Sequence, residues 1–540
     1  MDTPATANPP KALTREMREE ILRRRTFAII SHPDAGKTTL TEKLLLYAGA
    51  VEAAGSVRPK KQQGHAKSDW MAMEQARGIS ITSTALQFEY EGCLFNLLDT
   101  PGHQDFSEDT YRTLTAVDSA VMVLDSAKGI EPQTRKLFEV CSMRNVPILT
   151  FVNKMDQSGR DAMELLDEIE RVLGIVACPV NWPVGYGPQF QGVVDFATRR
   201  LMRYRRNTGG QHRADAYELS VDGPEFEETV GAENAAQLNE VSSLLAGVVP
   251  PFEKELFLRG RQTPVFFGSA LNNFGVDYFL RALVGLAPPP LPRISTQGPV
   301  DPASADFSAV VFKIQGNMDP QHRDSMAFLR ICSGRFERDM LVHNPRLGKK
   351  IRMTRVHRLF ARDRQTVDEA FAGDVVGVVN PGMFVIGDTL SGTPGIEYER
   401  MPSFQPEHFG SLRMGDMSKT KQFRKGLVQL AEEGVVQVYH DPHGLRREPI
   451  LGAVGRLQFD VVESRLMQEY GVRVTVDSLP YVCARWPRGT PQALAKVRWP
   501  SSGVALAQDQ NGQTVCLFSS PWDLQTLSRD YPDVRFSETS

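Results

Sequence analysis

Apolar and polar positions follow two rhythms over the first part of the chain. Short apolar runs alternate with stretches whose apolar residues recur at the spacing of an amphipathic helix. The pattern predicts strands at residues 26–30, 94–98, 120–124, 148–152 and 263–267, and a short helix at 12–25. Strands that alternate with helices favour a parallel α/β sheet, and the ligand of such a sheet sits at the carboxyl ends of the strands.

Residues 180–260 interrupt this alternation. Period-two patterns at 192–196 and 201–204 predict a hairpin, and a helical pattern over 237–258 is broken by two prolines. Because the strand at 263–267 follows, we interpret the stretch as an insertion within the first domain.

The pattern changes again after a proline-rich linker at 287–292. Residues 307–390 contain short alternating strands and almost no helical pattern, which predicts a small β-barrel. After a boundary near 402–406, the order strand, helix, two strands, helix, strand predicts a split-βαβ domain, with a small α/β addition at the end. The pattern contains no internal repeat. The predicted domains are 1–290, 291–403 and 404–540.

The composition is that of a globular chain. The 540 residues are 41% hydrophobic and 24% charged, with a net charge of −3. This charge argues against general affinity for nucleic acid, so we expect no DNA partner and only local basic patches for RNA. The six cysteines include no closely spaced pair that would indicate zinc or redox chemistry. Because neither a membrane span nor a signal core is present in the pattern, we expect a cytoplasmic protein without a membrane partner. We also expect a monomer.

The first strand runs into a loop suited to phosphate, Ser31-His32-Pro33-Asp34-Ala35-Gly36-Lys37-Thr38. Gly36 lets backbone N–H groups approach a triphosphate, and the following helix directs its positive end there. Lys37 can reach the β- and γ-phosphates, and Thr38 can offer a hydroxyl to Mg²⁺. The first position is Ser31 where such loops usually have glycine, so a plain strand-to-helix turn with an exposed lysine remains the alternative.

A second motif, Asp99-Thr100-Pro101-Gly102-His103, follows the strand at 94–98. The carboxylate of Asp99 can hold Mg²⁺ through its water shell. The Gly102 N–H can bond a γ-phosphate, and His103 can orient the attacking water. The alternative for so short a motif is a simple turn.

A third motif, Asn153-Lys154-Met155-Asp156, follows the strand at 148–152. Asp156 can accept two hydrogen bonds from guanine, whereas adenine would leave its carboxylate unpaired. Asn153 can tie this loop to the phosphate loop, and the stem of Lys154 can lie along the base. The base pocket can be completed by the backbone N–H groups of Ser269, Ala270 and Leu271. A solvated loop is the alternative.

The segment between the first two motifs has the composition of a nucleotide switch. Ser80 can complete the coordination of Mg²⁺ when the γ-phosphate is present, so the segment would order with GTP and loosen after hydrolysis. Lys60, Lys61 and Lys67 precede it. They suit a flexible switch or a charged surface loop.

Together these motifs resemble the translation-factor GTPases, the relatives of elongation factors Tu and G. Within that family, the strings at 65–83, 99–118, 317–324, 426–439 and 452–462 resemble the bacterial class II release factors. The resemblance covers nearly the whole chain. It implies an α/β P-loop G domain with a mostly parallel sheet and an insertion, then a β-barrel domain and an α+β split-βαβ domain.

The resemblance also implies ligands. They are GTP or GDP, with Mg²⁺ held by Thr38, Ser80 and, through water, Asp99. A small residue at the first position of the phosphate loop is common in this family, so Ser31 fits it. Many members have threonine where this chain has Ser80, and the hydroxyl is retained.

The function implied by the resemblance is a ribosome-stimulated GTPase of translation termination. It would promote dissociation and recycling of class I release factors after peptide release, with His103, Lys37 and Gly102 as catalytic residues. The chain ends too early for the tRNA-mimicking domains of elongation factor G, which argues against translocation. One alternative is an elongation-factor-G-like ribosome protection or rescue GTPase. Another is a P-loop ATPase or kinase, which Asp156 opposes. The third is a GTP-binding scaffold that does not hydrolyse, which His103 opposes.

One tripeptide invites a different function. Gly209-Gly210-Gln211 spells the sequence with which class I release factors hydrolyse peptidyl-tRNA. We interpret it as ordinary loop composition at a hairpin tip. The surrounding arginines could bind phosphates or an acidic protein, or form a solvated face: Arg199, Arg200, Arg203, Arg205, Arg206 and Arg213. Lys421, Arg424 and Lys425, on a helix predicted in the third domain, could face the ribosome or form a solvated helix face.

Overall fold

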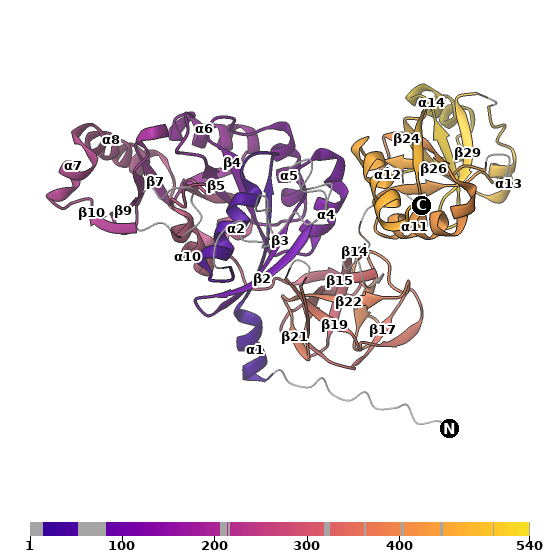
Figure 1. The fold of residues 1–540 in the computed structure, drawn as a ribbon, viewed down its shortest axis with the longest axis horizontal. Coiled ribbons are helices and arrows are strands. Elements are labelled where there is room, and N and C mark those ends of the chain that lie inside the picture. The colour runs from indigo at the N-terminus through magenta and orange to yellow at the C-terminus, as the bar shows by residue number, and fades with distance from the viewer. Residues whose placement is uncertain are drawn as a thin grey trace.

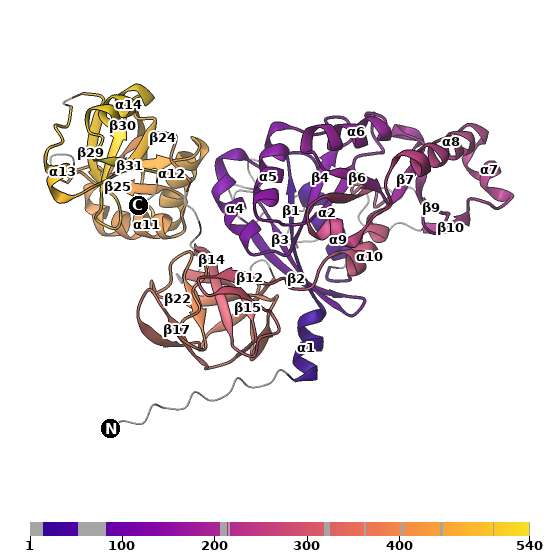
Figure 2. The same cartoon turned by 180° about the vertical axis from the view of Figure 1, so that it is seen from behind.

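Three units meet at one junction (Figure 1). The structure, a computed structural model, describes residues 14–51, 83–205, 213, 216–317, 325–360, 363–399, 401, 404–442, 447–500 and 502–538. An α/β unit and a C-terminal unit lie side by side, and a barrel-like unit lies against both (Figure 1 and Figure 2).

The α/β unit is built on a seven-stranded sheet with the order β2-β3-β1-β4-β5-β11-β6. Its strands are β1 (Arg24–Ser31), β2 (Thr84–Tyr90), β3 (Cys93–Asp99), β4 (Ser119–Asp125), β5 (Ile148–Asn153), β6 (Val176–Pro179) and β11 (Gln262–Phe267). Strand β2 runs antiparallel to β3, and the other neighbours are parallel. Strands β3, β4, β5 and β11 are buried along their whole length, which explains their continuous apolar runs.

Helices cover both faces of this sheet. They are α2 (Lys37–Tyr47), α4 (Ser107–Thr115), α5 (Pro132–Met143), α6 (Ala162–Leu173) and α10 (Val276–Leu286). Helix α1 (Arg15–Leu22) precedes β1 and packs on the barrel-like unit through Ile21, and η1 (Gln104–Phe106) precedes α4. One core includes Leu137 of α5 and Leu165 of α6, and the other includes Leu40 of α2 and Phe279 of α10. The helix expected at 12–25 ends earlier because the chain enters β1 at Arg24.

The insertion forms a four-stranded antiparallel sheet with the order β10-β9-β8-β7. Its elements are β7 (Asn181–Val184), η2 (Gly187–Gln189), β8 (Gly192–Asp195), β9 (Arg200–Tyr204), β10 (Ala216–Ser220), α7 (Glu225–Val230), α8 (Ala232–Val248) and α9 (Lys254–Leu258). The helical pattern predicted over 237–258 is thus two helices with the prolines between them. Helices α7 and α8 lie at the end of the molecule farthest from the C-terminal unit (Figure 1 and Figure 2).

Two of the hairpin arginines pair with acidic residues of the same insertion, whereas Arg213 donates to the Leu46 carbonyl of α2 at 3.1 Å. Arg199 pairs with Asp222 at 2.6 Å and Arg200 pairs with Glu218 at 2.8 Å, all four side chains being largely exposed. For these two arginines the structure favours the solvated face. The Gly-Gly-Gln tripeptide at 209–211 and Arg206 lie outside the described residues.

The barrel-like unit is an eight-stranded antiparallel sheet with the order β18-β17-β23-β14-β15-β22-β19-β20. Its strands are β14 (Ser308–Gly316), β15 (Ser325–Ser333), β17 (Leu341–Asn344), β18 (Lys349–Arg352), β19 (Val356–Phe360), β20 (Asp363–Thr366), β22 (Val375–Asn380) and β23 (Thr389–Ser391). Two ribbons accompany it, β12 (Arg293–Ser295) with β13 (Gly298–Val300), and β16 (Arg335–Glu337) with β21 (Glu369–Phe371).

The C-terminal unit begins with the predicted βαββαβ order. Its elements are β24 (His408–Met414), η4 (Met417–Lys419), α11 (Thr420–Glu432), β25 (Gln437–Tyr439), β26 (Ile450–Ala453), α12 (Leu457–Tyr470) and β27 (Val474–Leu479). The sheet order β25-β26-β24-β27 is that of a split-βαβ fold.

The small addition predicted at the end of the chain is a second unit of the same plan. It contains β28 (Cys483–Arg488), α13 (Pro491–Ala495), β29 (Val504–Gln508), β30 (Thr514–Phe518), α14 (Pro521–Asp530) and β31 (Arg535–Ser537). Its sheet order β29-β30-β28-β31 matches that of the first unit position by position. The fold therefore repeats where the sequence pattern shows no repeat.

Candidate nucleotide site

The phosphate loop joins the end of β1 to the start of α2. Gly36 is in the left-handed region with φ 94°, and a Cβ there would lie 2.2 Å from the Asn153 side-chain nitrogen. Both the backbone conformation and this close approach therefore require glycine. Helix α2 starts at Lys37, so the N-terminal end of the helix faces the loop.

Lys37 and Asp99 meet at the carboxyl ends of β1 and β3. Lys37 Nζ lies 2.6 Å from Asp99 Oδ1, and both side chains are buried. Asp99 Oδ2 and Ser31 Oγ are also buried, and neither has a hydrogen-bond partner among the described residues. An unpartnered carboxylate oxygen beside a buried ammonium group fits a hydrated cation next to a phosphate. Thr38 is half-buried in the first turn of α2.

His32 of the phosphate loop is held by a residue that we did not predict from the sequence. His32 Nε2 lies 3.1 Å from Oε1 of Glu131, which is the residue before α5. No sequence motif singles out Glu131.

The Asp99–His103 loop faces the phosphate loop. Thr100 Oγ1 donates to the Ile29 carbonyl of β1 at 2.6 Å. A Cβ on Gly102 would lie 3.7 Å from the Pro33 backbone, so the two loops are neighbours. The His103 side chain is 34% exposed, and its Nδ1 accepts from the Asp105 backbone N–H at 3.2 Å. That bond leaves Nε2 as the ring nitrogen available for another partner.

Asn153 joins three loops at the base end of the site. Its Nδ2 donates to the Ala35 carbonyl of the phosphate loop, and its Oδ1 accepts from the Ala270 N–H, both at 2.8 Å. Met155 N–H donates to the Gly268 carbonyl at 3.1 Å. The link from Asn153 to the phosphate loop is therefore the one expected from the sequence.

Asp156 is oriented by Asn272, which sequence reasoning missed. Asn272 Nδ2 donates to Asp156 Oδ2 at 2.8 Å. Asp156 Oδ1 is buried and has no hydrogen-bond partner in the described part of the chain. This oxygen fits the N–H donors of guanine. Asn272 directly follows the predicted loop at 269–271, but its residue type carries no specific signal.

Asp125 is a second missed residue, and it fixes Lys154. Lys154 Nζ donates to Asp125 Oδ2 at 2.8 Å. Burial alone would raise the pKa of Asp125. The hydrogen bonds from Lys154 and from the backbone N–H groups of Ala127 and Lys128 lower it by more than burial raises it, so the pKa lies below its usual value. Asp125 stands at the end of a predicted strand, beside Asn153 in the sheet register. An acidic residue directly after a predicted strand of this sheet was the sequence signal that could have indicated Asp125.

The loop at 269–271 differs from the expectation in one respect. The Ser269 N–H donates to the Phe274 carbonyl at 2.9 Å, and the Ala270 N–H donates to Asn153. Both groups are therefore used to hold the loop. Leu271 is exposed at the rim.

The structure thus gathers the three predicted motifs, together with the loop at 269–271, along the carboxyl edge of β1, β3, β5 and β11. Ser80, Lys60, Lys61 and Lys67 lie outside the described residues. None of the helices in the described parts of the chain is both long and apolar enough to span a membrane.

Family models match all three units. Residues 22–289 match the elongation factor Tu GTP binding domain, residues 306–393 match elongation factor G domain 2, and residues 398–528 match the C-terminal domain of class II release factor RF3. A crystal structure of a Thermus thermophilus protein has the same fold, with a TM-score of 0.68 at 24% identity. The match covers 91% of this chain and 71% of that one.

The fold and the site define a translational GTPase that binds a guanine nucleotide. Peptide chain release factor 3 of Gloeobacter violaceus is 54% identical over 96% of this chain and 98% of its own length. The proteins of the same name from Acaryochloris marina and Symbiobacterium thermophilum are 50% and 51% identical, over 98% and 97% of this chain and 97% and 98% of their own lengths. The chain belongs to the peptide chain release factor 3 family.

Membership of this family confirms the resemblance and the fold class expected from the sequence. The protein is a GTPase of translation termination. The ribosome protection or rescue alternative is not favoured, because residues 398–528 match the release-factor domain.

Proposed function

We propose that this GTPase binds GTP with Mg²⁺, hydrolyses it when the ribosome activates it, and uses the change to recycle class I release factors after peptide release. The observation that carries the proposal is the pairing of Lys37 with Asp99 at 2.6 Å beside the unpartnered oxygen of Asp99. That arrangement, in a member of the release factor 3 family, supports a triphosphate site built for hydrolysis.

The phosphate end binds through charge and backbone donors. Lys37 neutralises the β- and γ-phosphates, and the loop of residues 31–38 surrounds them with N–H groups. Thr38 and Ser80 would hold Mg²⁺ directly, and Asp99 would hold it through water. The bound ion would neutralise the negative charge that develops on the phosphate oxygens.

Hydrolysis depends on positioning. The Gly102 N–H bonds the γ-phosphate, and His103 orients the attacking water through the ring nitrogen that Asp105 leaves available. Phosphoryl transfer requires mainly alignment and charge stabilisation, so the unstimulated protein should be slow.

The base end selects guanine through Asp156. Its buried Oδ1 accepts from the base while Asn272 holds Oδ2. Lys154 lies along the base. The N–H groups of Ser269 and Ala270 hold the loop, so the backbone N–H of Leu271 is the one that bonds the base.

The proposed partners are the ribosome and a class I release factor, for a monomer in the cytoplasm. The proposed domains are 1–290, 291–403 and 404–540. Helix α11 offers the exposed Lys421, Arg424 and Lys425 as a candidate surface for ribosomal RNA.

Hydrolysis of GTP with and without ribosomes tests the proposal. Ribosomes should raise the rate by several orders of magnitude, comparable to the roughly 10³- to 10⁵-fold effect of an activating partner on other GTPases. His103→Ala should keep its GTP and GDP affinity and lose the stimulated rate. Equal rates with and without ribosomes, or an unchanged rate in His103→Ala, would refute the corresponding part of the proposal.

A further inference from the structure

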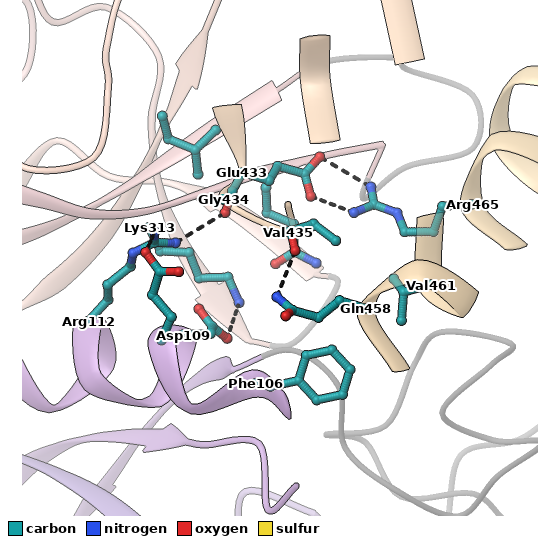
Figure 3. Close-up of a pocket in the computed structure, with 13 residues that line it drawn as sticks. Phe106, Asp109, Arg112, Lys313, Glu433, Gly434, Val435, Gln458, Val461 and Arg465 are labelled. Carbon is teal, nitrogen blue, oxygen red and sulfur yellow. Dashed lines mark hydrogen bonds and ion pairs between the residues drawn. The ribbon is translucent and has the colours of Figure 1, made fainter. Parts of the chain in front are cut away.

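The segment that carries His103 is seated on the C-terminal unit. Elements η1 and α4 follow His103 directly, and they meet α12 and β14 at the junction of the three units (Figure 3). Phe106 of η1 packs against Val461 of α12, and both side chains are buried. The last element before α4 is therefore part of a contact between units.

Asp105 connects His103 to the start of α12. Its backbone N–H donates to His103 Nδ1 at 3.2 Å, and its Oδ2 accepts from the Leu457 N–H at 2.8 Å. Leu457 is the first residue of α12, where the helix dipole favours a carboxylate. The Asp105 side chain is only 12% exposed, so this bridge is shielded from solvent.

Gly455, in the loop before α12, lies so close to the Asp105 side chain that no side chain fits at position 455. A Cβ on Gly455 would lie 2.0 Å from Asp105 Cγ. The loop is fixed by Gln458, whose buried Oε1 accepts from the N–H groups of Val454 at 2.7 Å and Gly455 at 3.1 Å. Because Gln458 fixes the backbone of this loop, an added methyl group at position 455 must displace the Asp105 side chain.

A second contact anchors the far end of α4. Arg112 Nη1 donates to the Glu433 carbonyl at 3.5 Å, and the Glu433 carboxylate is bound by Arg465 of α12 at 2.6 Å (Figure 3). The helix behind His103 is thus seated at both ends on the C-terminal unit.

We propose that Asp105 is a positioning residue for GTP hydrolysis, through which the seating of α12 on the G domain sets the orientation of His103. The inference rests on the proposed role of His103 in hydrolysis. A displacement of the C-terminal unit, such as binding to a ribosome could impose, is transmitted to the His103 ring by this bridge. The C-terminal unit thereby controls the rate of hydrolysis without touching the nucleotide.

Gly455→Ala in the full chain tests the link from a position outside the nucleotide site. It should lower kcat of ribosome-stimulated GTP hydrolysis by about 10- to 100-fold, the effect of a small misplacement of a catalytic group. KM for ribosomes and the affinities for GTP and GDP should stay within twofold, since the base and phosphate contacts are untouched. Gly415→Ala is the matched control, because its Cβ would make only an ordinary contact, 3.4 Å from the Arg473 carbonyl. It should behave as the unmodified protein.

A double-mutant cycle separates positioning from packing. Asp105→Ala should also lower kcat, and Gly455→Ala should cost nothing further in that background, because the carboxylate it displaces is gone. Additive effects, or a Gly455→Ala protein with normal kcat, would overturn the proposal. The double variant restores the space at the contact, so it keeps the test valid even where Gly455→Ala alone folds poorly.

His103→Ala, measured in the same series, distinguishes failure of the proposed role of His103 from failure of the proposed link through Asp105. If its kcat is unchanged, the proposed role of His103 fails. If its kcat collapses while Gly455→Ala keeps a normal kcat, the link through Asp105 alone fails.

Discussion

Two carboxylates at the base end of the site differ in what they bind. Asp156 has one oxygen held by Asn272 and one without a partner among the described residues, whereas Asp125 is bound by Lys154 and by backbone N–H groups. The first is prepared for a ligand and the second stabilises the loop. Substitutions at the two positions should therefore have different consequences.

Asp156→Asn should change the nucleotide preference from guanosine to xanthosine. The amide offers a donor where guanine requires an acceptor, and xanthine accepts at that position. Competition between GTP and xanthosine triphosphate for the purified protein measures the change. An undiminished preference for GTP would contradict the role of Asp156.

Asn272→Ala should weaken GTP and GDP alike by about tenfold, since a charge-assisted hydrogen bond to Asp156 is worth about 1.5–3 kcal/mol. The guanine preference should be retained, because Asp156 is still present. Titration with a fluorescent guanine nucleotide measures both affinities. An unchanged affinity would show that Asp156 is oriented without Asn272.

Asp125→Asn should lower thermal stability in a pH-dependent manner. The folded-state pKa of Asp125 is below its usual value, so the carboxylate contributes stability above the unfolded pKa of about 3.9 and loses it as pH falls through the folded value. The deficit should be constant near neutral pH, at about 2 kcal/mol, and shrink below about pH 4.

The melting temperature as a function of pH measures this difference. Asp222→Asn is the control, because Asp222 is bonded to Arg199 at an exposed position and such pairs contribute little. A deficit for Asp125→Asn that persists unchanged in acid would contradict the assignment.

Among the elements, the turn from β1 into α2 has the strictest requirement. Gly36→Ala would combine a left-handed backbone with a contact of 2.2 Å to Asn153. It should abolish measurable GDP binding and separate the phosphate loop from the base loop. Gly247→Ala in α8, where a Cβ would meet nothing within 4 Å, should bind GDP normally. Isothermal titration of both variants measures the effect, and normal binding by Gly36→Ala would contradict it.

The elements that could be predicted from the sequence are those whose own residues show a clear apolar run or periodicity. Apolar runs indicated the sheet strands because β3, β4, β5 and β11 are buried on both faces. The plan of the second split-βαβ unit was missed because two of its elements bury few residues. Helix α13 has five residues, none of them buried, and strand β29 has five residues with one buried. Such segments carry little periodicity.

The residues of the site also divide into those with a local sequence signal and those without one. The residues of the three motifs were predicted because each motif follows a strand and has a recognisable spacing. Asn272 and Glu131 were not, because they act through single contacts with no motif. The bond from Leu457 to Asp105 joins residues 352 positions apart, and no local pattern encodes such a pair.

At the scale of the whole molecule, the barrel-like unit is fixed to the α/β unit by buried ion pairs. Arg330 of β15 lies 2.5 Å from Asp118, and Arg24 of β1 lies 2.9 Å from Asp374, with all four side chains at most 3% exposed. The C-terminal unit meets the α/β unit instead through η1 and α4, the two elements that follow His103. We expect the first two units to move together and the C-terminal unit to change its seating.

Arg330→Ala should destabilise the protein by about 3–5 kcal/mol, because it leaves Asp118 buried without its main partner. The double variant Arg330→Met with Asp118→Leu should recover only part of this loss, because Asp118 also accepts from the Leu291 N–H and faces Arg293. Arg338→Ala removes an exposed partner of Asp368 and should cost no more than about 1 kcal/mol. Chemical denaturation measures all three, and a small loss in Arg330→Ala would show that this pair does not fix the barrel.

Multiple-turnover peptide release from stop-codon ribosomes, with a class I release factor limiting, tests the central claim most directly. With this protein and GTP, each class I factor should act on many ribosomes, and the steady-state rate should rise several-fold. The His103→Ala protein should give no such increase. A steady-state rate that is the same with and without the protein would contradict the account, as would release of peptide by the protein alone.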